Sequence, residues 1–390
     1  VIFSRYYGAD NFGLYSIGLC IFTLLGTLSI MGLNFGLSRY TSIYGHKDTK
    51  KLKNIMLIFF TISVTISLLL SFSLILFSNY LSLIYKNPGL SIIFKYFAIG
   101  IPFYVIMSFS QKALEGFKNF KYSIILETSL SAIKLLFLLF CVLYSLSLSF
   151  VLLSFRLSLF IVGILGVFLV DRFVSIKNII KSKFDIGLFN EMFVYSWPLS
   201  MALILHTALS WFDSLMLGYF KPMSEVGVYN LALSIAALIN LPSIVGNSVL
   251  LPIFSELHEK KDKNQIRLTY LTSFRWLSIL SLPILFILIS YPDFILNIVG
   301  GNDFVIGNSA LVILSFGFIV TTVIIPSTII LLAVGKTKFL LINTLIAMII
   351  NFILNLLLIP KYGFIGAAFS FLITSIVINL LRLIEVKNLL

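Results

Sequence analysis

Long apolar stretches alternate with short polar or turn-forming segments along the whole chain. Because the hydrocarbon core of a bilayer requires about 20 apolar residues per helix, each stretch is interpreted as a membrane-spanning helix. Cutting the chain at charges and turn residues predicts eleven spans, over residues 12–37, 55–84, 91–110, 122–144, 149–170, 194–219, 226–250, 271–291, 306–334, 338–359 and 362–384. The cut at 144–149 follows from length, since one helix over 122–170 would extend about 73 Å at 1.5 Å per residue. Residues 1–7 are interpreted as the end of a further helix whose beginning is missing.

The composition indicates an integral membrane protein of the all-α class. Of the 390 residues, 59% are hydrophobic and 11% are charged, and the mean hydropathy is +1.07. A soluble domain carries about 25% charged residues. The apolar runs are continuous and do not alternate, which argues against a membrane β-barrel. The two cysteines, Cys20 and Cys141, each lie inside an apolar run, so we expect no disulfide framework, no metal site and no cofactor.

Lysine and arginine residues gather in alternate loops. Of the 28 basic residues, 21 fall on one side of the predicted topology and five on the other, while Lys134 and Arg156 fall within spans. Cytoplasmic loops are enriched in Lys and Arg. We therefore expect a multi-pass protein of the cytoplasmic membrane whose truncated first helix begins in the cytoplasm. This asymmetry explains the net charge of +13 without nucleic-acid binding.

The two halves of the chain resemble each other. The segment 13–21 matches the segment 227–235, and at the same offset along the chain Gly32 meets Gly246. This offset corresponds to six helices, an even number, so both copies would enter the membrane in the same direction. We predict two six-helix bundles related by a pseudo-two-fold axis, over 1–170 and 194–390, joined by a cytoplasmic linker over 171–193. Parallel repeats of this kind place a substrate site at their interface near the membrane midplane.

Several segments carry a family resemblance, in order, over nearly the whole chain. They are Tyr7-Gly-Ala-Asp-Asn-Phe-Gly-Leu-Tyr15, Gly32-Leu-Asn-Phe-Gly-Leu-Ser-Arg-Tyr40, Asp213-Ser-Leu-Met-Leu-Gly218, Val226-Gly-Val-Tyr-Asn-Leu-Ala232, Leu251-Pro-Ile-Phe-Ser255 and Leu358-Ile-Pro-Lys-Tyr-Gly-Phe-Ile-Gly-Ala-Ala368. Together they resemble the Wzx-type flippases of lipid-linked oligosaccharides, a branch of the multidrug/oligosaccharidyl-lipid/polysaccharide exporter superfamily with the MATE-like fold. The resemblance implies 12 to 14 helices, so one or two C-terminal helices would be missing here.

Two sequence motifs resemble enzyme signatures, but neither is complete. Gly335-Lys-Thr337 is similar to the end of a phosphate-binding loop, but Ile330 stands where the loop requires glycine. His258-Glu259 begins a zinc-protease pattern, but Asp262 stands at the position of the second histidine. The chain is therefore predicted not to be an enzyme.

Ionisable groups within membrane helices are costly unless they face a cavity or a partner, so each is a candidate site residue. A lipid pyrophosphate needs cations along its path, and the candidates for substrate binding in a central cleft are Lys134, Arg156, Glu127, Arg39 and Asn34. Asp213 and His206 lie seven residues apart on one helix face and are candidates for ion or proton coupling.

Each candidate also has a purely structural alternative. Glu127 and Lys134 could pair with each other, and Arg156 could extend to the outer interface. Arg39 could be a positive-inside anchor, and Asp213 and His206 could be packing residues. The asparagines, including Asn351 and Asn355, could hold helices together.

Three functions remain open at this point. The first is alternating-access flipping of a polyprenyl-pyrophosphate-linked oligosaccharide, for which the resemblance implies polysaccharide polymerases and glycosyltransferases as partners. The second is cation-coupled antiport of drugs or small molecules by the same fold. The third is a membrane polymerase or glycosyltransferase. It is disfavoured because the longest predicted outer loop, 292–305, holds only Asp293 and Asp303 as ionisable groups.

Overall fold

The computed structural model describes residues 2–45, 47–180, 182 and 184–387, and within these ranges every regular element is a helix. The elements are α1 (Ile2–Ile30), α2 (Leu33–Tyr44), α3 (Thr49–Ile84), α4 (Gly89–Gly116), α5 (Phe120–Leu143), α6 (Leu148–Asp171), α7 (Ile176–Ile180), α8 (Ile186–Phe220), α9 (Met223–Ala236), η1 (Ala237–Asn240), α10 (Leu241–Glu259), α11 (Lys263–Ser290), α12 (Pro292–Gly300), η2 (Asn302–Gly307), α13 (Asn308–Ala333) and α14 (Thr337–Lys387).

The predicted membrane spans correspond to helices. Ten helical segments in the described part of the chain are long and apolar enough to cross a membrane. The last, α14, is divided at Gly363 (φ 56°), so it accounts for two of the eleven predicted spans. The predicted cut at 144–149 is confirmed, since α5 ends at Leu143 and α6 begins at Leu148. The chain is a multi-pass, all-helical membrane protein.

Some predicted boundaries were wrong. The span 12–37 is interrupted where Met31 (φ 49°) and Gly32 (φ 68°) take left-handed conformations, which end α1 and start α2 in a new direction. The span 226–250 is interrupted by the 3₁₀ turn η1. The segment 292–305, predicted as a loop, forms α12 and most of η2. Within the predicted linker, α7 forms and α8 begins at Ile186, where the Asp185 carboxylate caps the helix by accepting hydrogen bonds from the Gly187 and Leu188 amides.

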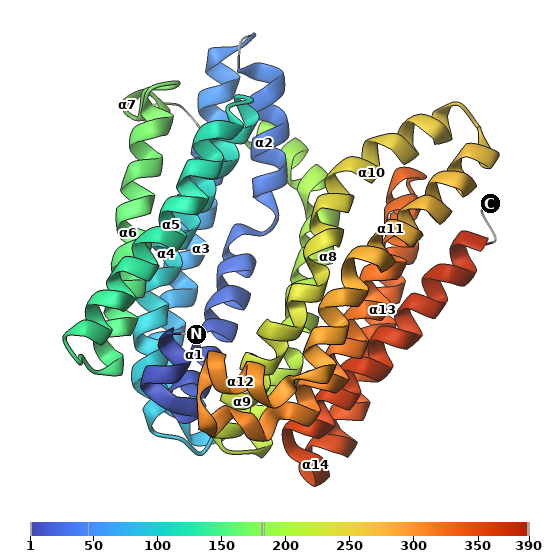
Figure 1. The fold of residues 1–390 in the computed structure, drawn as a ribbon. Coiled ribbons are helices and arrows are strands. Elements are labelled where there is room, and N and C mark those ends of the chain that lie inside the picture. Colours follow the sequence, from blue (N-terminus) through green and yellow to red (C-terminus); the bar gives the residue numbers. More distant parts are fainter. Residues whose placement is uncertain (1, 46, 181, 183, 388–390) are drawn as a thin grey trace. The chain divides into compact units, whose positions relative to one another are not determined.

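The chain forms two compact units, one made of Ile17–Ala208 and the other of the residues up to Ser16 together with those from Leu209 onward. In the first, α4 packs against α2, α3, α5 and α6 (Figure 1). Its core includes the fully buried side chains of Phe59, Phe94 and Leu114. The membrane helices α3 to α6 thus surround one apolar centre.

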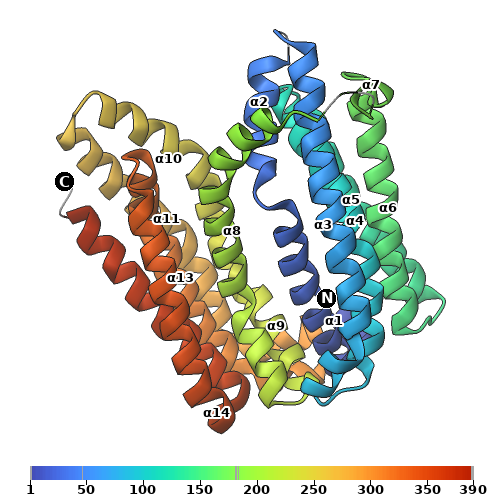
Figure 2. The ribbon, with the colours of Figure 1, turned by 180° about the vertical axis from the view of Figure 1, so that it is seen from behind.

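In the second unit, α13 packs against α9, α10, α11 and α14. In both views, α10 and α11 form an antiparallel hairpin (Figures 1 and 2). The first turns of α1 belong to this unit, because Ser4 Oγ donates to the Val299 carbonyl and Phe12 packs edge-on against Phe304 at 6.1 Å between ring centroids. The predicted bundles 1–170 and 194–390 stay a prediction, since the compact units divide the chain at other positions.

Positions that the predicted duplication makes equivalent carry similar local structure. Asp48 caps α3 by accepting hydrogen bonds from the Lys50 and Lys51 amides, and Asp262, at the equivalent position, caps α11 by accepting one from Gln265. Side-chain oxygens at this position satisfy amides that have no partner in the first helical turn. These matching caps favour the predicted duplication, while the pseudo-two-fold relation of whole bundles remains a prediction.

Candidate functional site

Lys134 lies on α5 with its ammonium group over an aromatic ring of the neighbouring helix. Its Nζ is 4.2 Å from the centroid of the Phe155 ring on α6, and the side chain is half-buried. Phe155 is buried and contacts Phe22 and Phe97, at 5.3 and 5.1 Å between ring centroids. A cation over an aromatic face gains about 0.5–2 kcal/mol. The rings therefore fix the position of the charge without neutralising it.

Glu127 lies two turns before Lys134 on α5 and is exposed. It accepts a 3.5 Å hydrogen bond from Gln111 Nε2 on α4. Neither ion pair seen among the described residues involves Glu127 or Lys134. The alternative in which these two residues neutralise each other is therefore not observed in that part of the chain.

Arg156 follows Phe155 on α6, directly after the ring that Lys134 covers. Its guanidinium carbon is 5.6 Å from the centroid of the Tyr96 ring on α4, and the side chain is half-buried. Lys134 contacts Phe155, and Arg156 is the next residue of α6. Both cations of the predicted site are thus at the same turn of α6, each beside an aromatic ring. That both contact substrate remains a prediction.

Arg39 and Asn34, the other two predicted binding residues, lie on α2. Arg39 is exposed, and its guanidinium carbon is 4.2 Å from the Tyr195 ring centroid on α8 and 5.8 Å from that of Tyr40. Asn34 is buried, and its Oδ1 accepts a hydrogen bond from the Phe35 amide. Arg39 is therefore the more accessible of the two.

The contact between α2 and α8 depends on small residues. A Cβ atom at Gly32 would lie 2.5 Å from the Ser200 Cβ, and one at Gly36 would lie 2.7 Å from the Ser196 Oγ. Small residues spaced four apart let two membrane helices approach closely. This contact between the helices places the Arg39 guanidinium over the ring of Tyr195 on α8.

Asp213 is the centre of a buried hydrogen-bond network in the other compact unit. One carboxylate oxygen accepts from Asn351 Nδ2 at 2.8 Å and from Asn355 Nδ2 at 2.7 Å, both on α14. The other accepts from the Tyr229 hydroxyl on α9 at 2.9 Å. Asp213 is 5% exposed, and all three partners are neutral. Three neutral donors offset part of the desolvation cost of a buried carboxylate, and a proton or a bound cation would offset more.

One oxygen of this network has no hydrogen-bond partner among the described residues. The Asn355 Oδ1 is buried and accepts no hydrogen bond within the described residues, while the Nδ2 of the same amide also donates to Asn351 Oδ1 at 3.0 Å. An unused amide oxygen beside a carboxylate suits a proton donor or a hard cation, since hard cations prefer oxygen ligands.

His206 lies two turns before Asp213 on α8 and is exposed. The predicted pairing of the two residues as one coupling element remains a prediction. The observed partners of the carboxylate come instead from α9 and α14.

Sequence reasoning did not single out Tyr229 or Arg382. Tyr229 lies in a segment that carries the family resemblance, but its contact with Asp213 depends on tertiary packing. Arg382 is half-buried on α14, where Nη1 donates to Asn379 Oδ1 at 3.4 Å and Nε has no partner within the described residues. Lys134 and Arg156 are thus not the only cations within the helical bundles. The signal available in the sequence was the position of Arg382, two residues before the end of the predicted span 362–384.

Comparisons with known proteins agree with this architecture. Residues 1–258 match the model of the family described as polysaccharide biosynthesis protein, and residues 198–357 match that of the MatE family. A protein of Haloferax volcanii assigned as a flippase of low-salt glycan biosynthesis is 31% identical over 159 residues, which are 41% of this chain and 34% of that protein. The match therefore covers about a third of that relative. A protein of Shigella flexneri assigned as an O-antigen transporter is 23% identical over 97% of this chain and 90% of its own length.

The fold is similar to that of a protein of known structure. The structure of the lipid II flippase MurJ in an inward closed conformation superposes with a TM-score of 0.80 at 17% identity, covering 99% of this chain and 84% of that one. None of these three proteins is named as an enzyme. With two thirds of its length matched by the family model, the chain belongs to the polysaccharide biosynthesis protein family.

Proposed function

We propose that this protein is a flippase that moves a polyprenyl-pyrophosphate-linked oligosaccharide across the cytoplasmic membrane by alternating access, for the synthesis of a surface polysaccharide. The family membership, the relatives assigned to glycan flipping and O-antigen transport, and the MurJ-like fold support this proposal. A membrane polymerase or glycosyltransferase has no comparable support.

The observation that carries the proposal is the charge on Lys134. A half-buried ammonium on a membrane helix, over a ring and without a carboxylate partner among the described residues, costs free energy unless it serves an anionic ligand. A lipid pyrophosphate supplies such an anion. Arg156, on the turn that Lys134 contacts, adds a guanidinium that can hold two phosphate oxygens at once.

The other candidate residues have complementary roles in this proposal. Arg39 with its tyrosines offers a cation and aromatic faces to the arriving headgroup, and Asn34 and Glu127 offer polar contacts for sugar hydroxyls. Asp213 and His206 couple transport to an ion or proton gradient. The basic loops face the cytoplasm, and the polysaccharide polymerase and glycosyltransferases of the same pathway are the partners.

Cation-coupled antiport of small molecules is the second candidate function. It is favoured by one observation, the buried Asp213 network, which lies within the segment that matches the MatE family. In that case carboxylates, and not buried cations, would recognise the substrate.

Expression in cells that lack their own flippase separates the two candidates. A flippase restores surface polysaccharide and leaves drug efflux unchanged, whereas an antiporter lowers drug accumulation and leaves the polysaccharide absent. Drug efflux without polysaccharide export would overturn the proposed function.

A further inference from the structure

A basic pocket lies at the beginning of α3, in the first of the two compact units. It encloses about 830 Å³ between the first turns of α3 and residues at the end of α7 and the beginning of α8. Figure 2 shows α7 at the end of this unit where α3 begins. The Ser182 hydroxyl donates to the Lys53 carbonyl at 3.4 Å. The Asp185 amide donates to Asn54 Oδ1 at 3.3 Å. The pocket is therefore built by tertiary contacts between residues far apart in the chain.

Three lysines of α3 line this pocket, and none of them forms an ion pair with a described residue. The Nζ of Lys51 lies 5.2 Å from the ring centroid of Tyr44. Lys50 is exposed and Lys53 is half-buried, and no hydrogen bond engages either ammonium group in the described part of the chain. Like charges at close range repel each other, so a bound anion would lower the free energy of the group.

One acidic residue is found among the described residues that line the pocket, and it is already engaged. Asp185 Oδ1 accepts hydrogen bonds from the Gly187 amide at 2.8 Å and from the Leu188 amide at 3.3 Å. This carboxylate therefore serves the first turn of α8. Since three lysines face one aspartate, the lining keeps an excess of positive charge.

The same pocket has an exposed apolar edge. Phe184 and Ile186 line it and are 46% and 68% exposed. A soluble phosphate needs cations only, whereas a phospholipid brings a charged headgroup and hydrocarbon chains together. The combination of unpaired lysines and exposed apolar side chains thus favours a lipid ligand.

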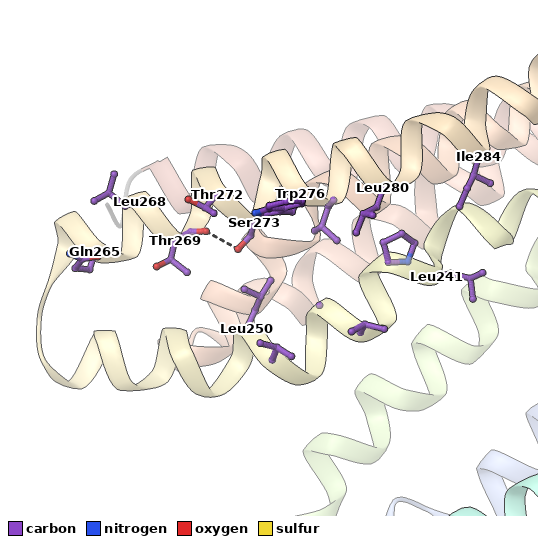
Figure 3. Close-up of a pocket in the computed structure, with 15 residues that line it drawn as sticks. Leu241, Leu250, Gln265, Leu268, Thr269, Thr272, Ser273, Trp276, Leu280 and Ile284 are labelled. Atoms are coloured by element: carbon purple, nitrogen blue, oxygen red, sulfur yellow. Dashed lines mark hydrogen bonds between the residues drawn. The ribbon is translucent and has the colours of Figure 1, made fainter.

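The open groove between α10 and α11 has a contrasting lining. Figure 3 shows its side chains along the gap between the two helices, among them Trp276 and Leu280. Every described residue that lines it is neutral, so the groove offers no cation to a phosphate. Its volume of about 700 Å³ is close to that of the basic pocket. The charge of the lining, and not the volume, therefore distinguishes the pocket at the beginning of α3.

A second basic pocket lies at the equivalent place in the other half of the chain. It encloses about 390 Å³, and Asn264 and Arg267 of α11 line it together with Lys387 of α14. At the offset of the predicted duplication, Asn264 corresponds to Lys50 and Arg267 to Lys53. The described lining of this second pocket includes no carboxylate. A basic pocket at the first turns of both helices favours a shared use of the two places.

We infer that the pocket at the beginning of α3 binds an anionic phospholipid, with its phosphate at Lys50 and Lys53 and its acyl chains along Phe184 and Ile186. Basic pockets between helices of membrane proteins bind acidic lipid headgroups. The ligand is a component of the membrane and not cargo, so the inference does not rest on the proposed flippase function. A bound lipid would fasten the beginning of α8 to α3.

The measurement is acetylation of lysines in the purified full chain, mapped by mass spectrometry. Nanodiscs of phosphatidylcholine are compared with nanodiscs that also contain phosphatidylglycerol. Lys47 is the internal control, because it is exposed like Lys50 and does not line the pocket. We expect phosphatidylglycerol to lower the acetylation of Lys50 and Lys53 severalfold relative to Lys47, because a bound phosphate occupies their ammonium groups.

Two substitutions test the two parts of the site. Lys53→Gln should weaken the protection of Lys50 by phosphatidylglycerol severalfold, because it removes a charge-assisted hydrogen bond to phosphate. Ile186→Ser should also weaken this protection, because it removes an apolar contact. Val194→Ser is the matched control for Ile186→Ser, since Val194 lies on the same helix, is 72% exposed and does not line the pocket. Protection should persist in this control.

Three results would overturn the inference. Equal protection of Lys47 and Lys50 would show that only the general surface potential of the membrane acts on these lysines. Equal protection by inorganic phosphate in phosphatidylcholine nanodiscs would identify a site for a soluble anion. Protection by undecaprenyl phosphate but not by phosphatidylglycerol would identify a site for the lipid carrier. Polysaccharide export by the parent chain tests the proposed function separately, so either result can fail without the other.

Discussion

Gly13 of α1 and Gly227 of α9 lie back to back, each at the point where the other helix leaves no room for a side chain. A Cβ atom at Gly13 would overlap the Met223 carbonyl and lie 3.0 Å from the Gly227 amide nitrogen. A Cβ atom at Gly227 would overlap the Ala9 carbonyl and lie 3.1 Å from the Gly13 amide nitrogen. The contact is reciprocal, as in a two-fold symmetric interface.

The four positions are related by the offset of the predicted duplication. Ala9 and Met223 are separated along the chain by the same offset as Gly13 and Gly227. A reciprocal contact is what a pseudo-two-fold relation between these two local segments predicts.

Substitution of either glycine by alanine should destabilise the protein. At Gly13→Ala or Gly227→Ala the methyl group meets backbone, which cannot move aside as a side chain could, so we expect a loss of about 3 kcal/mol or more. The measurement is thermal unfolding of the purified protein in detergent. Gly163→Ala is the control, since a Cβ there meets its nearest atom at 3.6 Å. Equal melting temperatures for all three variants would show that the helices do not approach this closely.

Asp213→Asn should remove the dependence of transport on the coupling ion. The variant keeps the shape of the side chain but can neither carry the charge nor exchange the proton. Tyr229→Phe is the matched variant, because it removes one neutral donor and leaves the carboxylate in place. Export is measured while external pH and sodium are varied separately. Asp213→Asn with the parent dependence on both would exclude this carboxylate from coupling.

The sequence predicted the spans because hydropathy reports directly on burial in lipid. It did not predict the breaks at Met31 and Gly32, because a glycine in an apolar run is compatible with a continuous membrane helix. The segment 292–305 was predicted as a loop since it is short and contains Pro292, Gly300 and Gly301, yet proline is well tolerated in the first turn of a helix.

The sequence predicted several residues of the candidate site but not the contacts between them. Asp213, Asn351 and Asn355 each stood out as polar residues in apolar helices, but hydrogen bonds between residues 138 and 142 positions apart require the tertiary fold. The position of Lys134 over Phe155 likewise depends on how α5 packs against α6. Helix periodicity gives the face on which a residue lies, not the neighbour that it meets.

Arg39 should contribute through both its charge and its aromatic neighbour. Tyr195→Phe keeps a ring beside the guanidinium, so export should persist, whereas Tyr195→Ala removes the cation–π contact of about 0.5–1 kcal/mol at an exposed site. We expect Tyr195→Ala and Arg39→Gln to lower the initial rate of export several-fold, more at low substrate supply than at high. Protein abundance in the membrane is measured alongside. Full export by Arg39→Gln at low substrate supply would support the alternative that this residue is only a positive-inside anchor.

The proposed function depends most directly on two cations, Lys134 of α5 and Arg156 of α6. Polysaccharide export by variants of these two residues tests it. The assay is restoration of surface polysaccharide in cells that lack their own flippase, at matched protein levels. Lys121→Gln, on an exposed position of the same helix as Lys134, is the control. We predict that Lys134→Gln and Arg156→Gln each lower export, that Lys134→Arg retains more export than Lys134→Gln because it keeps the charge, and that the double Gln variant is inactive although it inserts and folds. Full export by the double Gln variant would contradict the account.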